Sequence, residues 1–320
     1  MTATATAPTT SDTTSPRRLF RRRGGDGWGV ALWFLLPSLI GFVIFFLIPT
    51  IRAIRLSFQR ATILNIDAAT GVGFDNYSEL WNDDRFWKAV EVTAKYVVLN
   101  IGSQTILALF LAVMMNRLTK SLLVRGVVLL PWILPNVLVG LLFLFMLDPS
   151  VGVVNVVLGW FGIDPIAFLA NPDWVVPALA FMNTWKFTGY TALLLFAGMQ
   201  VIPDSLYEAG ALDGASEWKM FRTITLPLLR PVLALVMVVS LIGSFQVFDT
   251  VQAAGGGVQG NPGDPLGESR VLYLYIYENA FLFQNKFGYA AALATVLMVF
   301  LMVITLLQLW LTRANQSDLA

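Results

Sequence analysis

Long apolar stretches dominate the chain and alternate with shorter polar ones. The hydrocarbon core of a bilayer is about 30 Å thick, and a helix rising about 1.5 Å per residue needs about 20 apolar residues to cross it. Six stretches approach that length: residues 28–48, 92–113, 126–147, 174–199, 232–248 and 289–311. The pattern predicts an all-α integral membrane protein with six transmembrane helices.

Polar sequence fills the two ends and the longer intervals. Residues 1–27 are small and polar, then basic, and predict a disordered tail, while residues 313–320 predict a second tail. Residues 49–91 predict a loop after the first span. The other five spans form a core over residues 92–312, which contains a charged loop at residues 203–231.

Arginines precede the first apolar stretch at positions 17, 18, 21, 22 and 23. The Arg17-Arg18 pair is compatible with a twin-arginine export signal. The apolar run that follows is longer than a signal-peptide core and has no small-residue cleavage site. These features favour a first transmembrane helix with a positively charged cytoplasmic flank.

The basic residues of the short loops predict the orientation, because Lys and Arg mark the cytoplasmic side. They lie between the second and third spans and between the fourth and fifth, at Arg117, Lys120, Arg125, Lys219, Arg222 and Arg230. Residues 149–173 contain no Lys or Arg. We therefore expect both termini and the loop 203–231 on the cytoplasmic side of the membrane.

The loop 49–91 is predicted to lie outside, although it carries Arg52, Arg55 and Arg60. Its length and its acidic residues give these arginines less weight than those of short loops. The segment PTIRAIRLSF is typical of a short interfacial helix. The segment FDNYSELWNDDRFW fits either an outer docking surface or an interfacial belt of Trp and Tyr with solvated charges.

Composition supports the membrane assignment and excludes several chemistries. Hydrophobic residues make up 57% of the chain and charged residues 13%, whereas about 25% charged residues is typical of soluble domains. The chain has no Cys and no His, which excludes disulfides, thiolate or imidazole metal sites and Ser-His-Asp catalysis. Its formal net charge of +1 gives no indication of a nucleic-acid partner.

The sequence also lacks the phosphate-binding pattern G-x-x-x-x-G-K-[ST], so the chain cannot bind ATP by that means. The glycine cluster 255–257 lacks the following lysine, and we interpret it as a flexible loop rather than a phosphate site.

The loop 203–231 has strong local signals. Ser205 and Glu208 form a capping-box pattern that predicts a helix starting near Ser205. Asp213-Gly214 predicts a tight turn, and helix-forming residues resume after it. Pro227 and Pro231 set the angle of the next span. The result is a helix–turn–helix that either covers the ends of two spans or docks on another protein, as its small residues favour.

The stretch YEAGALDGASEWKMFRTITLPLLRP resembles the signature of membrane subunits of bacterial ATP-binding-cassette importers, in the branch that handles sugars and glycerol phosphate. The family pattern is Glu-Ala-Ala, a variable residue, an aliphatic residue and Asp-Gly-Ala, followed by Ile-x-Leu-Pro. Gly210 replaces the second alanine. The resemblance implies a type I importer permease fold with a cytoplasmic coupling helix–turn–helix.

The resemblance also implies how the chain works. A cytoplasmic ATPase dimer would receive the coupling residues Glu208, Ala209, Gly210, Leu212, Asp213, Gly214 and Ala215. This chain would be non-catalytic and bind no cofactor or metal, since ATP and Mg²⁺ belong to the ATPase. The other implied partners are a second, non-identical permease subunit and an extracytoplasmic solute-binding protein. Transport would follow alternating access.

Polar residues inside the spans are candidates for a substrate path, although many such residues only bridge helices. Three helical stripes stand out: Asn100 with Gln104; Asn183 with Lys186 and Tyr190; and Gln246 with Asp249. A buried Lys186 must face a cavity or a carboxylate such as Asp249, or else its side chain extends to the membrane surface.

Two other classes compete with an importer permease. An ion-coupled secondary transporter is expected to show intramembrane acidic clusters or broken helices in related halves, and neither is evident in the sequence. An intramembrane enzyme would have to rely on carboxylates and hydroxyls, which form no motif here.

Overall fold

The computed structural model describes residues 27–313 except 67, 119–120, 257–267 and 283–285. Nearly all of the two predicted tails and Gly257 of the glycine cluster lie outside the described residues. The chain divides into two compact units, Met1–Arg52 and Ala53–Ala320, which are described separately.

In the first unit the described residues are helical from Gly27 onward. Helix α1 (Gly27–Phe42) is followed by a π-helical turn, η1 (Val43–Leu47), and by α2 (Ile48–Leu56). The arginine-bearing segment predicted as an interfacial helix belongs to α2, and helical residues run from Gly27 to Leu56 without a break. From Leu32 to Ile51 the large apolar side chains are exposed, as expected of a helix that faces lipid.

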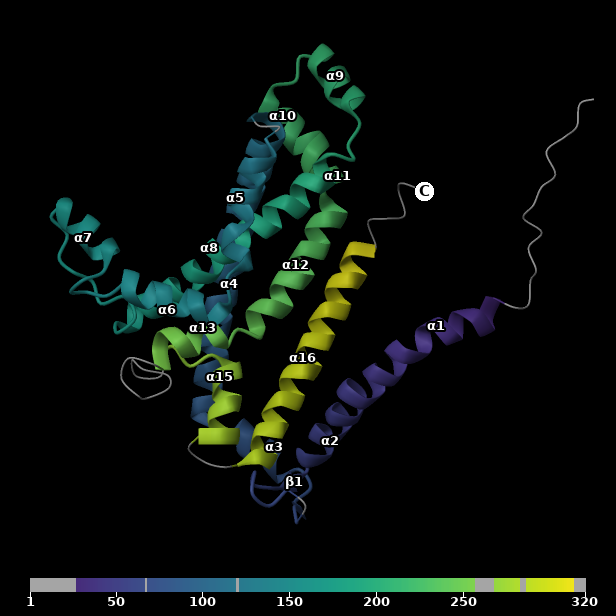
Figure 1. The fold of residues 1–320 in the computed structure, drawn as a ribbon, viewed down its shortest axis with the longest axis vertical. Helices are drawn as coiled ribbons and strands as arrows, with labels where there is room; N and C mark the ends of the chain where they lie inside the picture. The colour runs from purple at the N-terminus through teal and green to yellow at the C-terminus, as the bar shows by residue number, and fades with distance from the viewer. Residues whose placement is uncertain (1–26, 67, 119–120, 257–267, 283–285, 314–320) are drawn as a thin grey trace, which may run out of the picture. The chain divides into compact units, whose positions relative to one another are not determined.

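The second unit is mostly helical (Figure 1). Its elements are β1 (Gln59–Arg60), β2 (Thr70–Gly71), α3 (Asp75–Trp81), α4 (Asp84–Leu118), α5 (Leu122–Ile133), α6 (Asn136–Met146), α7 (Val153–Trp160), α8 (Pro172–Met199), α9 (Asp204–Leu212), α10 (Glu217–Met220), η2 (Phe221–Thr225), α11 (Leu226–Leu228), α12 (Arg230–Phe245), α13 (Asp249–Val251), η3 (Gln252–Gly256), α15 (Leu272–Tyr277), η4 (Glu278–Leu282) and α16 (Phe287–Arg313). The two short strands pair antiparallel, so the all-α prediction misses a small ladder in the loop 49–91.

Three helical stretches among the described residues are long and apolar enough to cross a membrane: Leu32–Leu56, Asp84–Leu118 and Phe287–Leu311. Two bent pairs bring the number to at most five, one fewer than predicted. The difference lies in α8, which matches the fourth predicted span but carries Lys186 and several threonines. These residues lower its hydropathy and are buried against other helices, so α8 is surrounded by protein more than by lipid.

The third predicted span, residues 126–147, is not one straight helix. It consists of α5 and α6, which meet at an angle of 92°. Leu134 and Pro135 separate them, and Leu134 has the extended backbone that a following proline favours. The 12 residues of α5 give it a length of about 18 Å, too short to cross a bilayer alone.

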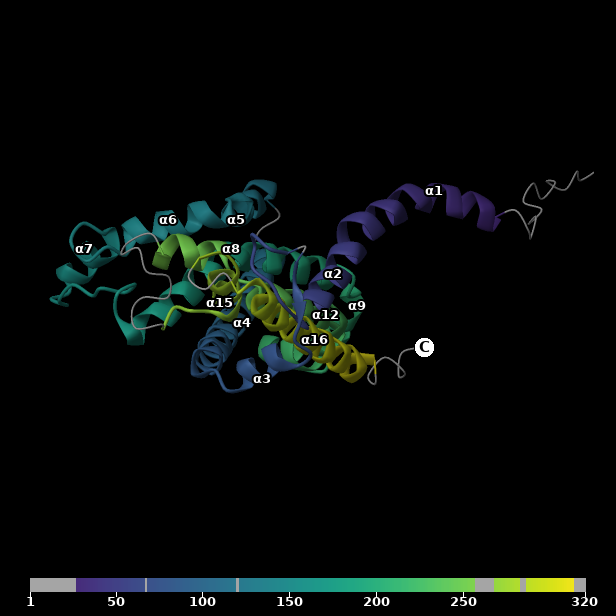
Figure 2. The ribbon, with the colours of Figure 1, turned by 90° about the horizontal axis from the view of Figure 1, so that it is seen from below.

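The core forms where α4 packs along α8 and α12, and α16 packs against α12; these helices lie side by side in both views (Figure 1 and Figure 2). Small residues such as Ala108, Ala112 and Ala192 line part of the contact between α4 and α8. The contact between α5 and α8 is closer still, because a Cβ atom on Gly189 would lie 1.9 Å from the carbonyl oxygen of Val128. Backbones approach this closely only at glycine.

A polar cluster fastens α3 and the start of α4 to α15 and α16. Asp83 accepts hydrogen bonds from the hydroxyls of Tyr289, at 2.6 Å, and Tyr275. Burial alone would raise the pKa of Asp83, but these hydrogen bonds and two from backbone amides lower it below its ordinary value. Burial and Asp83 raise the pKa of Tyr275 to about 12. This acidic residue of the FDNYSELWNDDRFW segment is therefore structural rather than solvated.

Candidate coupling surface and transport path

The predicted helix–turn–helix is confirmed and consists of α9, a turn and α10. Gly214 has a φ of +71°, the left-handed conformation that glycine adopts without strain. The amide of Ala215 donates to the carbonyl of Gly210 at 2.9 Å, which closes the end of α9. Ser216 caps α10 by accepting a hydrogen bond from the Lys219 amide.

The predicted capping box is wrong. Helix α9 begins at Asp204, with Pro203 at the N-cap position and no side-chain cap. Ser205 therefore lies inside the first turn rather than before it, where its hydroxyl would accept from a free amide. Asp204 instead places a negative charge at the positive end of the helix dipole.

The outer face of this helix–turn–helix is open. None of the residues of α9 is buried, and Leu212 is 90% exposed. Glu208, Ala209, Asp213 and Gly214 are also exposed, and Ala215 is half-buried. Leu206 and Trp218 are exposed as well as Leu212, and several exposed large apolar side chains on one short segment indicate a contact surface.

Gly210 differs from its neighbours because it faces the chain's own interior. A Cβ atom here would lie 3.2 Å from Ile224 Cδ1 and 3.3 Å from the sulfur of Met220. Gly210 therefore lets α9 pack closely on the segment that follows α10, which stiffens the helix–turn–helix.

A cavity of about 510 Å³ lies between the helix–turn–helix and the ends of α4 and α8. Glu208 lines it, and Arg117 of α4 forms an ion pair with Glu217 at its wall. The hydroxyls of Tyr207 and Thr225 are hydrogen-bonded at 2.9 Å. The helix–turn–helix is thus attached to α4 as well as to its sequence neighbours, a contact that sequence patterns could not reveal.

The side chains of Asn100 and Gln104 are buried and bridge helices. Asn100 donates to Ser244 Oγ at 2.8 Å and accepts from Thr184, while Gln104 donates to Thr191 Oγ1 at 2.8 Å. These bonds join α4 to α8 and α12 and use much of the capacity of both amides. The structure gives this stripe the bridging role.

The second stripe has a different geometry. Lys186 is 5% exposed, and its ammonium group donates to Asn136 Oδ1. Asn136 in turn donates to Asp249 Oδ2 at 3.2 Å. Asn136, at the start of α6, was not predicted, because only the bend after Leu134 brings it to α8. The predicted relation of Lys186 to Asp249 thus runs through an amide.

Tyr190 lies one helical turn beyond Lys186 and stacks on Trp132 of α5, with ring centroids 4.8 Å apart and an interplanar angle of 9°. Asn183, one turn before Lys186, is half-buried. The stripe on α8 therefore combines a buried cation with an aromatic pair.

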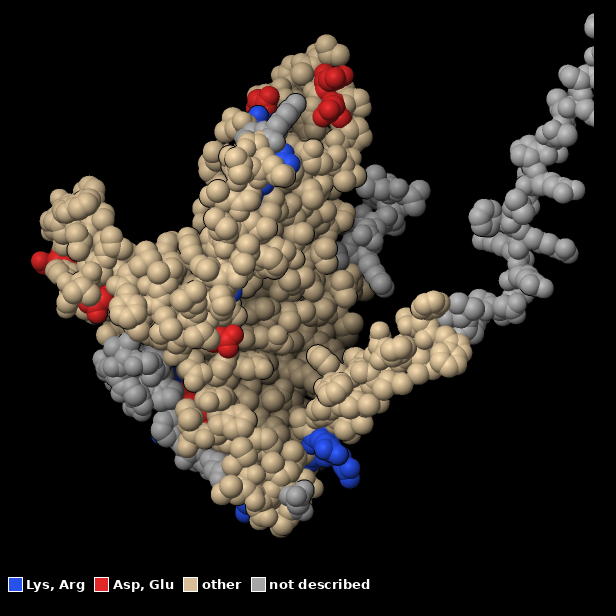
Figure 3. All heavy atoms as spheres, viewed as in Figure 1, with Lys and Arg blue, Asp and Glu red and all other residues tan. Residues whose placement is uncertain are grey.

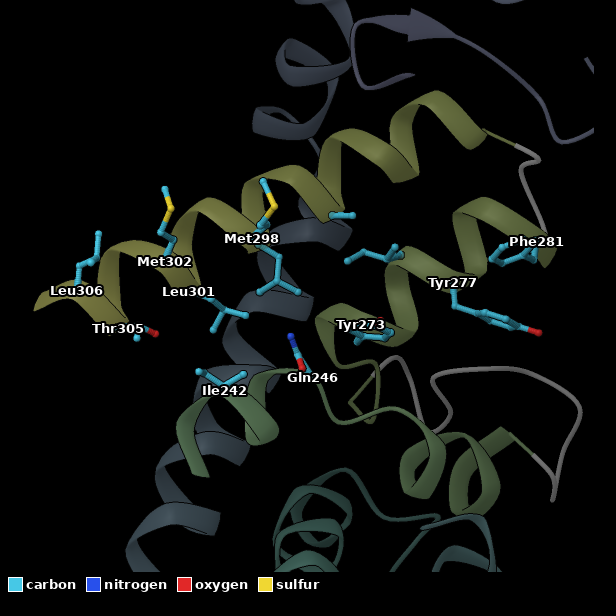
Figure 4. A pocket seen from close by; sticks show the side chains of 13 residues that line it. Ile242, Gln246, Tyr273, Tyr277, Phe281, Met298, Leu301, Met302, Thr305 and Leu306 are labelled. Carbon is cyan, nitrogen blue, oxygen red and sulfur yellow. The ribbon is translucent and has the colours of Figure 1, made fainter. Parts of the chain in front are cut away.

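Gln246 and Asp249 do not form a stripe on one helix, so that prediction is wrong. Helix α12 ends at Phe245, and Asp249 begins α13. Gln246 instead lines a cavity of about 580 Å³ with residues of α12, α15, η4 and α16 (Figure 4). In that view its side chain lies among Ile242, Tyr273 and Leu301, whereas Asp249 meets α6.

Charged side chains are sparse on the face of the second unit seen in Figure 3, where most of the surface between α9 and α3 is neither acidic nor basic. Among the described residues, no three of the types His, Cys, Asp and Glu gather into a metal site. Apolar spans, buried polar bridges and an open helix–turn–helix at one end define a membrane-embedded transport subunit.

The family follows from comparison with known proteins. Residues 104–316 match the family of the binding-protein-dependent transport system inner membrane component. The chain belongs to this family, and it is a non-catalytic, multi-pass permease subunit of an ATP-binding-cassette importer in the inner membrane.

Several relatives are similar over most of their length. The lactose transport system permease protein LacF of Rhizobium radiobacter is 34% identical over 95% of this chain and 99% of its own. The trehalose/maltose transport system permease protein MalF of Thermococcus litoralis is 31% identical over 85% of this chain and 88% of its own. A chain of a bacterial transporter that imports the acidic polysaccharide alginate has a TM-score of 0.77 and 28% identity, over 90% of this chain and 96% of that chain.

Proposed function

We propose that this chain forms half of the translocation path of an ATP-driven importer for a saccharide, with six spans and both termini in the cytoplasm. The observation that carries the proposal is the open helix–turn–helix with the sequence EAGALDGA at one end of the helical core. The names of similar permeases, for lactose and for trehalose and maltose, support a saccharide as the substrate.

The partners in this proposal are a second permease, a dimer of ATPase subunits and an extracytoplasmic solute-binding protein. One similar structure is a complex of the alginate transporter with a periplasmic protein that carries an alginate pentasaccharide, which supports the last of these. ATP and Mg²⁺ act on the ATPase subunits, and this chain binds no cofactor.

The helix–turn–helix acts as a lever in this mechanism. Leu212 and the exposed small residues fit a cleft of the ATPase, and Glu208 supplies a charged contact beside the cavity under α9. Closure of the ATPase dimer moves α9 and α10, and the attachment of α10 to α4 through Arg117 and Glu217 carries this motion into the bundle. The path between the two permeases then changes from inward-open to outward-open.

In this proposal the path runs along the α8 stripe of Asn183, Lys186 and Tyr190 with Asp249 at its end. Gln246 lies on a different side, in the cavity beside α16. Asn100 and Gln104 hold the helices that form the path rather than touching substrate.

The test is co-purification of the complex with transport measured in proteoliposomes. An ATPase should co-purify with the wild-type chain, and Glu208→Lys should abolish uptake-coupled ATP hydrolysis while membrane insertion stays normal. Normal uptake by this variant would refute the coupling role. Uptake that survives ATP depletion but stops when the proton gradient collapses would instead identify an ion-coupled transporter.

A further inference from the structure

The contact between Lys186, Asn136 and Asp249 bears on the charge of the transported molecule. The buried ammonium of Lys186 donates to Asn136, and Asn136 donates to the carboxylate of Asp249, which is exposed. The cation is thus enclosed at one end of a hydrogen-bonded chain, and the anion lies at its open end. A ligand that reaches this surface meets the carboxylate and not the ammonium.

The nearest other cation in the sequence is Arg125 on α5, seven residues before Trp132, and its guanidinium lies over the ring of Phe196, 4.3 Å from the ring centroid. Between Arg125 and Arg270 the only basic residues are Lys186, Lys219, Arg222 and Arg230. The last three belong to the helix–turn–helix segment at residues 203–231. Lys186 is therefore the one cation that this long stretch contributes outside that segment, and it is already compensated.

The neighbouring side chains suit a sugar. Tyr190, one turn from Lys186 on α8, stacks on Trp132, which lies on α5 four residues before Asn136 and on the other side of the bend. Aromatic rings pack against the weakly apolar faces of sugar rings, and a carboxylate accepts hydrogen bonds from hydroxyl groups. The same carboxylate repels a phosphate or a second carboxylate.

We infer that the substrate is an uncharged saccharide and that the face formed by Trp132, Asn136, Tyr190 and Asp249 disfavours sugar phosphates, aldonates and uronates. The inference rests on the proposed function and goes beyond the family, since a similar transporter imports an acidic polysaccharide. It excludes glycerol phosphate, which the sequence resemblance left open.

The first experiment measures uptake by the complete transporter, with its binding protein, in proteoliposomes. The panel pairs neutral disaccharides with acidic counterparts of similar size: maltose with maltobionate, lactose with lactobionate, and trehalose with trehalose 6-phosphate. Uptake restricted to neutral members is expected. Uptake of an acidic member at a comparable rate would overturn the inference and leave the saccharide importer intact, whereas no uptake of any member would refute the proposed function and the inference with it.

The second experiment tests the compensated charge directly. Asp249→Asn leaves the buried ammonium of Lys186 without its counter-charge, and uptake of the neutral substrate should fall about tenfold or more, because an uncompensated buried charge is costly. The double variant Lys186→Met with Asp249→Asn should recover to within about threefold of the wild type. Asp164→Asn, which removes an exposed carboxylate outside the path, is the matched control and should have no effect.

A third measurement does not depend on how much protein folds: the inhibition of uptake of the neutral disaccharide by its acidic counterpart. Asp249→Asn should increase this inhibition at least threefold, since the carboxylate is gone and the charge of Lys186 is uncompensated, and the double variant, which lacks both charges, should show a smaller increase. Unchanged uptake in Asp249→Asn, or a double variant worse than both single variants, would overturn the role of the pair.

Discussion

Helix α8 and the helix–turn–helix of α9 and α10 use small residues for opposite purposes. In α8, Gly189 has the backbone of α5 directly against it, and most of the helix is buried within the chain. In the turn after α9, Gly214 has no atom within 4 Å of the place where a Cβ would lie. Helix α8 is thus packed against other helices of this chain, whereas the helix–turn–helix leaves a surface open for another protein.

The largest effect is expected at Gly189. The substitution Gly189→Ala places a methyl group against the Val128 carbonyl and should destabilise the folded chain by about 3 kcal/mol or more. Thermal unfolding in detergent measures this loss. Gly102→Ala in α4 is the control, because nothing lies within 4 Å of its Cβ position. A Gly189→Ala protein as stable as the control would show that the contact between α5 and α8 is looser than described.

Leucines in the two regions give the next contrast. Leu212→Asp should leave stability within about 0.5 kcal/mol of the wild type, because the side chain is 90% exposed, but should reduce co-purified ATPase at least about tenfold. Leu195→Asp in α8 buries a charge and should prevent folding. Size-exclusion profiles and ATPase recovery separate the two outcomes. Full ATPase recovery with Leu212→Asp would remove this residue from the contact surface.

A smaller effect is expected where the helix–turn–helix meets α4. Arg117→Glu breaks the ion pair with Glu217. The side chains of Arg117 and Glu217 are 41% and 68% exposed, so the free energy of unfolding should change by about 1 kcal/mol or less. Substrate-stimulated ATP hydrolysis should fall several-fold, because α10 is no longer attached to α4. The exchange Arg117→Glu with Glu217→Arg should restore it. A lack of rescue would show that the pair does not transmit motion.

The smallest effect is expected for Gly210→Ala, which restores the residue of the family pattern. The new methyl group would meet the flexible ends of Ile224 and Met220 at 3.2 to 3.3 Å, and the gain in helix propensity, about 1 kcal/mol, offsets this contact. The free energy of unfolding should stay close to that of the wild type, and the rate of uptake should stay within about twofold of it. Strong loss of uptake would mean that Gly210 faces the partner rather than the chain.

The contrast between the regions also explains what could be predicted from the sequence. The helix–turn–helix is governed by local signals, and the turn at Asp213-Gly214 and both helices were predicted. Even there the capping residue was wrong, since the N-cap is Pro203, two residues before Ser205. Whether the predicted coupling residues contact an ATPase stays a prediction.

Features that depend on tertiary packing could not be predicted in this way. The bend at Leu134 and Pro135 splits an apolar run that hydropathy treats as one span. Asn136 then meets Lys186, a residue 50 positions away, and no periodicity connects them. Gln246 and Asp249 have helical spacing, but α12 ends at Phe245, before both residues, and Asp249 begins a separate helix.

The hydrogen bonds of α8 also have a consequence for how the chain enters the membrane during synthesis. With Lys186 and its threonines, α8 partitions poorly into lipid as an isolated helix, and α5 is too short to cross on its own. Helix α4 emerges from the ribosome earlier and already carries Asn100 and Gln104, the partners of Thr184 and Thr191. Because α4 is translated before α8, hydrogen-bond partners for the threonines of α8 are already present when α8 is made. Helix α12 follows and adds the hydrogen bonds of Ser240 and Ser244 with the same two residues of α4.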